Sequence, residues 1–206
     1  MLQIWGRANS INVQKVMWTV GELGLEHVHH NVGGNAGGLD SPEFIAMNPH
    51  RTIPVIDDDG TVVWESGAIV RYLAAKYGSG GLWPEDPAER AAADQWAEWT
   101  HTTLQPYFLR LFQAVAKTPQ RNQNVQRVLN ISQRVGALYQ RLEVQLEGRS
   151  FIAGDQFTFG DISAGATLYR YYKMDVPGRP ALPNVMAWHE RLRGRDAYRQ
   201  HIEVPW

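Results

Sequence analysis

Apolar residues before residue 80 recur at two different spacings. Val13, Val16, Met17 and Val20 recur every three or four residues, which is the spacing of one helix face and predicts a helix over residues 10–23. Short apolar runs that end at turn residues predict strands instead. In chain order, the expected elements are a strand at 2–5, the helix at 10–23, a strand at 27–32, a helix that begins at 41, two strands on either side of 57–60 and a helix at 66–77.

The pattern changes at residues 78–84, where Gly-Ser-Gly-Gly-Leu-Trp-Pro has the composition of a linker. Beyond it no segment reads as a strand. One helical stretch is expected over 87–116, and apolar residues that step by three and four from Val125 to Leu146 predict a second. We expect these two to pack antiparallel at the centre of a helical bundle.

Two further helices complete the second half. Thr158 and Asp161 form a capping-box pattern before a helix at 162–172, and the last clear helix is expected at 183–192. The predicted domains are therefore an α/β domain at 1–78, a linker at 79–86 and an all-helical domain at 87–206.

Composition narrows the functional classes. The formal net charge of −1 gives no long-range attraction to nucleic acid or to an anionic membrane, and no block of like charges appears. There is no run of 18 apolar residues and no signal segment, so we expect a cytoplasmic protein. Zero cysteines exclude disulfides and any sulfur nucleophile carried by the protein. His29 and His30 are adjacent in a presumed strand and point to opposite faces, so no metal site is expected.

The densest motif runs from Asn48 to Tyr72. Ile53-Pro54 precedes an apolar pair where a central strand would need a backbone donor, so Pro54 fits the start of a strand and is a candidate for a cis peptide bond. Such a bend leaves the main chain of Ile53 able to pair with an extended peptide. Glu65-Ser66 opens a helix, whose N-terminus suits a carboxylate, while Glu65 suits an ammonium group. Together these groups fit a small zwitterionic peptide.

The spacing of Ile53-Pro54 from Glu65-Ser66 resembles the glutathione-binding half of the cytosolic glutathione transferases. The resemblance covers nearly the whole chain, including the opening W-G-R-A-N-S-I-N-V and the later F-T-F-G-D-I-S, and it is strongest to bacterial, serine-type, theta- or phi-like members. It implies a thioredoxin-like domain followed by an all-helical domain, glutathione as co-substrate, and a homodimer. It also implies that Ile53, Pro54, Glu65 and Ser66 bind glutathione.

The same resemblance places the catalytic group at Ser10, at the start of the first helix. A free thiol has a pKa of roughly 8.5, so only about 3% is ionised at pH 7. A hydroxyl donor beside a helix N-terminus can favour the thiolate without a charged base. Ser10 could equally be an ordinary helix cap. Asn9 and Asn12 are alternative donors to the thiolate.

Recognition of the glycyl end and of the second substrate is less defined. Arg51 is the candidate cation for the glycyl carboxylate, because the preceding loop lacks the basic residues that phi-like relatives carry. The electrophile site is expected between the domains. Its candidate residues are Trp99, Thr103, Tyr107, Phe108 and Trp206.

The predicted function is activation of the glutathione thiolate for attack on a small hydrophobic electrophile, by conjugation or dehalogenation. Two alternatives remain. One is a glutathione-dependent peroxidase or disulfide reductase, which starts from the same thiolate and needs no protein sulfur. The other is a non-catalytic module of this fold that binds apolar ligands or a protein partner.

Overall fold

The computed structural model describes residues 1–206, which divide into two compact units. The first unit contains Met1–Trp83 and the last eleven residues, Asp196–Trp206. The second contains Pro84–Arg195. The predicted helical domain over 87–206 therefore needs correction at its C-terminal end, because the chain returns to the first unit after Arg195. None of the helices combines the length and apolarity needed to cross a membrane.

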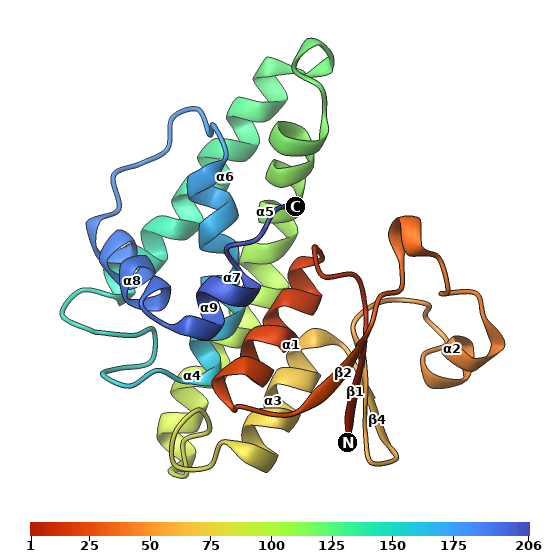
Figure 1. The fold of residues 1–206 in the computed structure, drawn as a ribbon. Helices are drawn as coiled ribbons and strands as arrows, with labels where there is room; N and C mark the ends of the chain where they lie inside the picture. The colour runs from red at the N-terminus through yellow and green to blue at the C-terminus, as the bar shows by residue number, and fades with distance from the viewer. The chain divides into compact units, whose positions relative to one another are not determined.

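The first unit has the predicted β-α-β-α-β-β-α order and a four-stranded mixed sheet, as the ribbon in Figure 1 shows. The strand order is β2-β1-β3-β4; β1 pairs parallel with β2, and the other pairs are antiparallel. The strands are β1 (Leu2–Trp5), β2 (His27–His30), β3 (Val55–Asp58) and β4 (Thr61–Trp64). The helices are α1 (Ile11–Glu22), α2 (Pro42–Met47) and α3 (Ser66–Tyr77), with a short 3-10 turn η1 (Gly34–Ala36) before α2.

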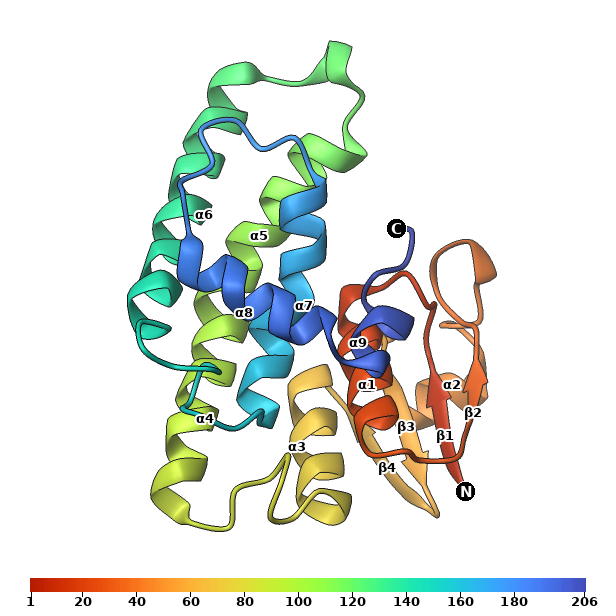
Figure 2. The same cartoon turned by 60° about the vertical axis from the view of Figure 1, so that its left-hand side comes forward.

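Helices α1 and α3 pack side by side against the sheet, and the figures agree on this arrangement (Figures 1 and 2). The predicted apolar face of α1 provides Val13, Val16, Met17 and Val20 to the core of the unit. These side chains are almost fully buried, and each buried aliphatic side chain of this size stabilises the fold by roughly 1.5–3 kcal/mol. The face identified from sequence is thus the face that joins the two helices to the strands.

A buried carboxylate fixes the far end of the sheet. Asp58, at the end of β3, accepts hydrogen bonds from Tyr72 Oη at 2.9 Å, Lys76 Nζ at 2.7 Å and Tyr77 Oη at 2.8 Å. Burial alone would raise the pKa of Asp58, but these hydrogen bonds outweigh it and hold the pKa below its ordinary value. The C-terminal half of α3 is therefore tied to β3 by polar contacts as well as by the apolar core.

Helix α9 (Asp196–His201) was not predicted, and it packs against α1. Trp18 and Tyr198 meet edge to face with ring centroids 4.8 Å apart. A Cβ at Gly21 would lie 2.8 Å from the Cβ of Ala197, so only glycine allows α9 to approach this closely. The six residues of α9 are too few to give a clear helical period, which explains why the sequence pattern does not reveal it.

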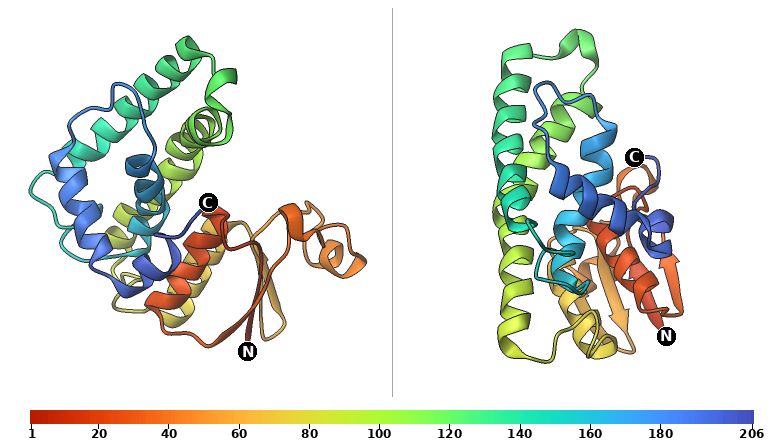
Figure 3. Two further views of the ribbon diagram at one scale, coloured as in Figure 1. Left: turned by 45° about the horizontal axis from the view of Figure 1, so that its top comes forward. Right: turned by 90° about the vertical axis from the view of Figure 1, so that its left-hand side faces the viewer.

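The second unit is entirely helical, as Figure 3 shows from two sides. Its elements are α4 (Pro87–Trp99), η2 (Thr100–Leu104), α5 (Gln105–Phe112), η3 (Gln113–Lys117), η4 (Gln120–Asn122), α6 (Val125–Gln145), α7 (Phe159–Lys173) and α8 (Pro183–Arg193). The predicted helix over 87–116 is continuous in path but widens into π-helical turns at η2 and η3. Pro106 lacks the N–H that would bond back into η2, which accounts for the first of these irregularities.

Helix α7, rather than the two long helices alone, forms the centre of this unit. It packs against α4, α5 and α8, and most of its residues are buried. Small residues make this possible: a Cβ at Gly160 would lie 2.7 Å from the carbonyl oxygen of Ala93 on α4. The predicted capping box at its start is present. The two long helical stretches were expected to pack antiparallel at the centre of the bundle. Helices α5 and α6 do pack antiparallel, but they lie to the side of α7 rather than at the centre of the unit.

Asp161 in this capping box is fully buried. Its carboxylate accepts from the main-chain N–H groups of Thr158 at 3.0 Å and Ile152 at 2.9 Å, and from Trp188 Nε1 at 3.0 Å. Burial raises the pKa of Asp161 to about 6, although these hydrogen bonds act in the opposite direction. The residue joins the start of α7 to α8 and to the loop before it.

Candidate functional site

The loop after β1 places Ser10 at the N-cap position of α1. Ser10 is the N-cap residue with φ −81° and ψ 125°, and its main-chain carbonyl accepts from Gln14 N at 2.9 Å. Its hydroxyl makes no capping hydrogen bond and no other hydrogen bond within the chain. The side chain is half-buried. The alternative in which the hydroxyl serves as an ordinary helix cap is therefore not realised in this structure.

The two neighbouring asparagines are engaged by cations. Arg7 Nη1 donates to Asn9 Oδ1 at 2.7 Å, and Lys15 Nζ donates to Asn12 Oδ1 at 3.3 Å. Because each amide oxygen faces a cation, the NH₂ group of each amide faces away from it. Asn9 is exposed, whereas Asn12 is half-buried. Each amide is thus oriented by a basic side chain.

A polar hollow lies beside Arg7 and Asn9. Its volume is about 470 Å³, and it is formed by residues 7–9, 31 and 33–36. Arg7 lies against the glycine-rich loop, since a Cβ at Gly34 would come within 3.1 Å of Arg7 Cδ. The missing side chain at Gly34 therefore lets Arg7 lie close to the main chain of this loop.

The peptide bond between Ile53 and Pro54 is cis, as the position of Pro54 suggested. Strand β3 begins one residue later at Val55, so Ile53 lies outside the ladder. Neither the N–H nor the C=O of Ile53 makes a hydrogen bond within the chain. Both groups are thus able to pair with an added extended segment, which is the arrangement by which peptides extend a sheet.

Asn48 supports this bend, although no sequence pattern singled it out. It is fully buried, its Nδ2 donates to the carbonyl of Thr52 at 2.9 Å, and its Oδ1 accepts from His50 N at 3.0 Å. The turn before Ile53 is therefore fixed by one side chain. The sequence shows only an asparagine directly before a proline, which does not reveal that its amide is buried and must find partners in the main chain.

The second group of candidate ligands lies at the start of α3. Glu65 is the N-cap with φ 69° and ψ 117°, a left-handed conformation that is uncommon outside glycine, and its side chain is exposed. Ser66 is the first helical residue and only 5% exposed. Residues held in such conformations concentrate at functional sites. The first N–H groups of α3 give this end a partial positive charge that favours a carboxylate.

Lys15 is the second residue that sequence reasoning missed. It is a fully buried lysine on α1. Burial lowers its pKa from 10.5 to about 7, and only the negative charge of Glu65 acts to raise it. Lys15 therefore couples electrostatically the helix that carries Ser10 to the residue that opens α3. Lys15 lies away from the apolar face of Val13, Val16, Met17 and Val20, so the helical pattern of the sequence gives no sign that it is buried.

Arg51 has a left-handed conformation with φ 54°, and its guanidinium forms an ion pair with Asp40 at 3.0 Å. The pair is exposed, with side-chain exposures of 55% and 85%, so it contributes little to stability. It does hold the cation at the turn that precedes Ile53.

The candidate residues for the electrophile are dispersed. Phe108 is fully buried and stacks on Phe112. Tyr107 is half-buried, and its ring centroid lies 5.4 Å from the guanidinium carbon of Arg110 and 5.1 Å from that of Arg134. Trp99 is half-buried and meets Trp96 edge to face at 5.2 Å. Thr103 lies in η2 and Trp206 in the first unit, both half-buried.

The chain matches two family profiles. Residues 9–76 match the glutathione S-transferase N-terminal domain, and residues 94–196 match the glutathione S-transferase C-terminal domain. The chain is 34% identical to glutathione S-transferase GstB of Escherichia coli strain K12, over 100% of this chain and 99% of the relative.

Solved structures give the same result. The theta class glutathione S-transferase of Xanthomonas axonopodis pv. citri, solved with glutathione bound, is similar with a TM-score of 0.94 and 39% identity, over 99% of this chain and 98% of that one. Glutathione transferase E6 of Drosophila melanogaster superposes with a TM-score of 0.83 and 28% identity, over 98% and 91%.

Proposed function

The chain belongs to the glutathione S-transferase family, and on that premise we propose that Ser10 activates the thiol of glutathione for attack on a small hydrophobic electrophile. This proposal rests on one observation: the hydroxyl of Ser10 lies at the N-cap of α1 and makes no hydrogen bond within the chain. In the reaction a carbon–sulfur bond forms and the electrophile loses a leaving group or opens a ring. Conjugation and dehalogenation both begin in this way.

The energy required is within reach of these groups. Lowering a thiol pKa from about 8.5 to about 6.5 requires that the anion be favoured by roughly 2.7 kcal/mol. A hydrogen bond to a charged group contributes about 1.5–3 kcal/mol, and a helix N-terminus adds about 0.3–1 kcal/mol. One hydroxyl donor at the first turn of α1 is therefore sufficient. Asn9 and Asn12 are the competing donors, each tied to a cation by its oxygen.

Glutathione itself would lie along the Ile53–Pro54 bend and the start of α3. The unpaired N–H and C=O of Ile53 suit the cysteinyl unit, and Pro54 sets their direction. Glu65 suits the ammonium of the γ-glutamyl unit, while Ser66 and the N-terminus of α3 suit its carboxylate. Arg51, already placed beside the bend, is the candidate for the glycyl carboxylate. The solved theta class relative with glutathione bound supports glutathione as the ligand.

Titration calorimetry with glutathione tests this binding site. Glu65→Gln should weaken binding about tenfold or more, because the ammonium loses a charge-assisted hydrogen bond. Glu43→Gln is the matched control, since Glu43 is an exposed carboxylate in the first turn of α2. Equal affinity of the Glu65→Gln variant and the control would contradict the assignment of Glu65.

Our proposals on the second substrate and on the assembly are motivated by family membership rather than by the geometry of this structure. We propose that Trp99, Thr103 and Trp206 contact the electrophile, because Phe108 is fully buried and Tyr107 lines a hollow between α5 and α6. We also propose a cytoplasmic homodimer with a role in detoxification. A panel of halogenated, epoxide, peroxide and disulfide substrates separates conjugation and dehalogenation from peroxidase or disulfide reductase chemistry. Gel filtration that gives only a 23.3 kDa species would contradict the dimer.

A further inference from the structure

The net charge of the chain is close to zero, but its basic and acidic residues are unevenly distributed along the sequence. Between Thr100 and Leu142 there are six lysine and arginine residues and no aspartate or glutamate. The six cations are spaced along the segment, so no contiguous block reveals them. They are Arg110, Lys117, Arg121, Arg127, Arg134 and Arg141. This segment folds into η2, α5, η3, η4 and most of α6, which together form a basic helical hairpin in a chain that is acidic elsewhere.

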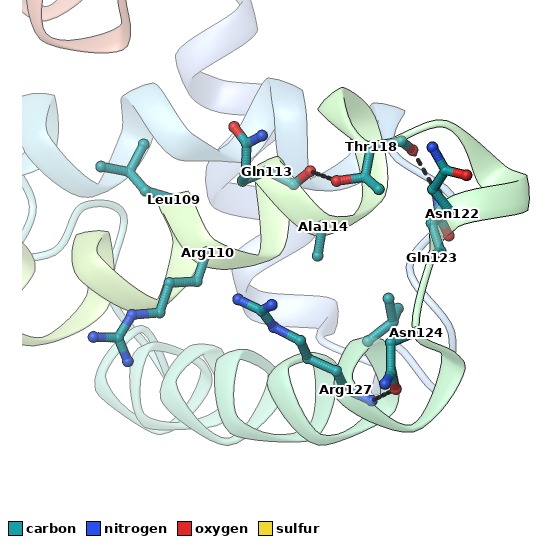
Figure 4. Close-up of a pocket in the computed structure, with 10 residues that line it drawn as sticks. Leu109, Arg110, Gln113, Ala114, Thr118, Asn122, Gln123, Asn124 and Arg127 are labelled. Carbon is teal, nitrogen blue, oxygen red and sulfur yellow. Dashed lines mark hydrogen bonds between the residues drawn. The ribbon is translucent and has the colours of Figure 1, made fainter.

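Two adjoining hollows follow the groove between α5 and α6. One has a volume of about 350 Å³ and lies near the loop that joins the helices; the other has a volume of about 560 Å³. Arg110, Asn124 and Arg127 line both of them. Figure 4 shows the side chains of Arg110 and Arg127 reaching into the space between the two helices. No carboxylate lines either hollow.

The Tyr107 ring lies close to two arginines of this groove. The guanidinium carbon of Arg110 lies 5.4 Å from the centroid of the Tyr107 ring, and that of Arg134 lies 5.1 Å from it. The negative face of an aromatic ring attracts a cation at such distances. None of Arg110, Arg127 and Arg134 has an ion pair with a carboxylate. Three like charges thus share one groove without a counter-charge from the protein.

The end of the groove adds neutral donors and a helix terminus. Asn124 caps α6 by accepting from Arg127 N at 2.9 Å through Oδ1, which leaves its NH₂ group as a donor. Helix α6 is 21 residues long, so its N-terminus carries a substantial partial positive charge at the same place. The planar guanidinium fork binds phosphate oxygens in pairs.

We propose that the groove between α5 and α6 is a binding site for a small, multiply charged oxyanion of the phosphate class. Its residues, Arg110, Arg127, Arg134 and Asn124, are all different from those assigned to glutathione, so the proposal does not depend on the transferase mechanism. The ligand is a small compound rather than a nucleic acid, because Tyr107 is the only aromatic residue that lines either hollow, whereas single-stranded nucleic acids stack successive bases on several aromatic side chains.

Titration calorimetry of the full chain with inorganic pyrophosphate, in about 0.15 M salt to screen diffuse attraction, tests this inference. The double variant Arg110→Met/Arg127→Met removes two charges that line both hollows. The double variant Arg121→Met/Arg141→Met removes two exposed charges from the same basic segment that line neither. The two variants have the same net charge, so any difference between them reports the groove.

We expect saturable binding with one site per chain in the wild type and in the Arg121→Met/Arg141→Met variant. Binding should be tenfold or more weaker in the Arg110→Met/Arg127→Met variant. The single variant Arg127→Met should show an intermediate loss and serves if the double variant does not fold. Equal weakening in both double variants would overturn the proposal in favour of diffuse attraction. Absence of saturable binding in the wild type would overturn it as well, and so would binding to anionic vesicles or single-stranded DNA in place of pyrophosphate.

Discussion

Arg7 donates a 2.7 Å hydrogen bond to the amide oxygen of Asn9, directly before the start of α1. The two leading donors for the thiolate therefore differ in kind. Asn9 is exposed and oriented by a cation, whereas Ser10 is half-buried and its hydroxyl has no hydrogen bond. A donor that is less hydrated gives up less water when it binds an anion, and this difference favours Ser10.

Replacing Ser10 with alanine should lower the rate of glutathione conjugation by tenfold or more at pH 7. The change removes the donor to sulfur but leaves Ile53, Glu65 and Ser66 in place, so the KM for glutathione should change little. Asn9→Ala is the comparison variant and should retain most of the activity. Steady-state kinetics with a chromogenic aryl halide measures both parameters. A normal rate in Ser10→Ala together with a large loss in Asn9→Ala would transfer the role to the amide.

Lys15→Met should stabilise the protein most at low pH. The pKa of Lys15 is about 7 in the folded state and about 10.5 when unfolded, so the unfolded chain binds more protons between these values. The wild type should therefore gain stability as pH rises from 7 to 10.5. At pH 7 and below, removing the buried charge should raise the free energy of unfolding by roughly 2–4 kcal/mol.

Urea unfolding of the Lys15→Met variant at several pH values measures this difference. The gain over the wild type should shrink steadily towards pH 10.5. Lys117→Met, which removes an exposed lysine, is the control and should show no comparable gain. A stability difference that stays constant with pH would contradict the account of Lys15.

Gly21→Ala should weaken the docking of α9 on α1. The added methyl group would lie 2.8 Å from the Cβ of Ala197, which is too close for ordinary contact. Overpacking of this kind costs about 1–3 kcal/mol. The exchanged pair Gly21→Ala/Ala197→Gly moves one methyl group across the contact and should recover much of the loss. Thermal unfolding of both variants beside the wild type measures the loss and its recovery.

Asp161→Asn should destabilise the helical unit by about 2–4 kcal/mol, because the amide NH₂ faces a main-chain N–H where the carboxylate oxygen accepted one. Thermal denaturation followed by circular dichroism measures the loss. Burial raises the pKa of the wild-type carboxyl from 3.8 to about 6. Between these two pH values the unfolded chain loses the proton while the folded chain keeps it, so the free energy of unfolding falls as pH rises. The Asp161→Asn variant should lack that component of the pH dependence, and an unchanged pH profile would contradict this account of the buried carboxyl.

Much of the fold could be predicted, because its elements have strong local signals. The apolar period of α1 and the Ser41-Pro42 start of α2 are local features that the structure repeats. The central position of α7 and the docking of α9 could not be predicted. Both depend on small residues, Gly160 and Gly21, whose importance is visible only when the partner helix is in place.

The residues of the candidate site likewise include some that the sequence reveals and some that it does not. Ile53-Pro54 and Glu65-Ser66 could be proposed as glutathione ligands from the sequence, because their spacing is a motif. Lys15 and Asn48 were missed because each acts through burial, and a buried lysine or asparagine looks like a surface residue in the sequence alone. The basic groove was missed for a related reason. Its arginines come from two helices, and only the packing of α5 against α6 brings them together.

The ultraviolet absorbance of the glutathione thiolate, followed against pH in the binary complex, tests the central claim most directly. If Ser10 favours the anion at the start of α1, the apparent pKa of the bound thiol should lie near about 6.5, roughly two units below the free value. The Ser10→Ala complex should move back towards about 8.5. A bound thiol that titrates near about 8.5 in the wild type, with glutathione demonstrably bound, would contradict the account.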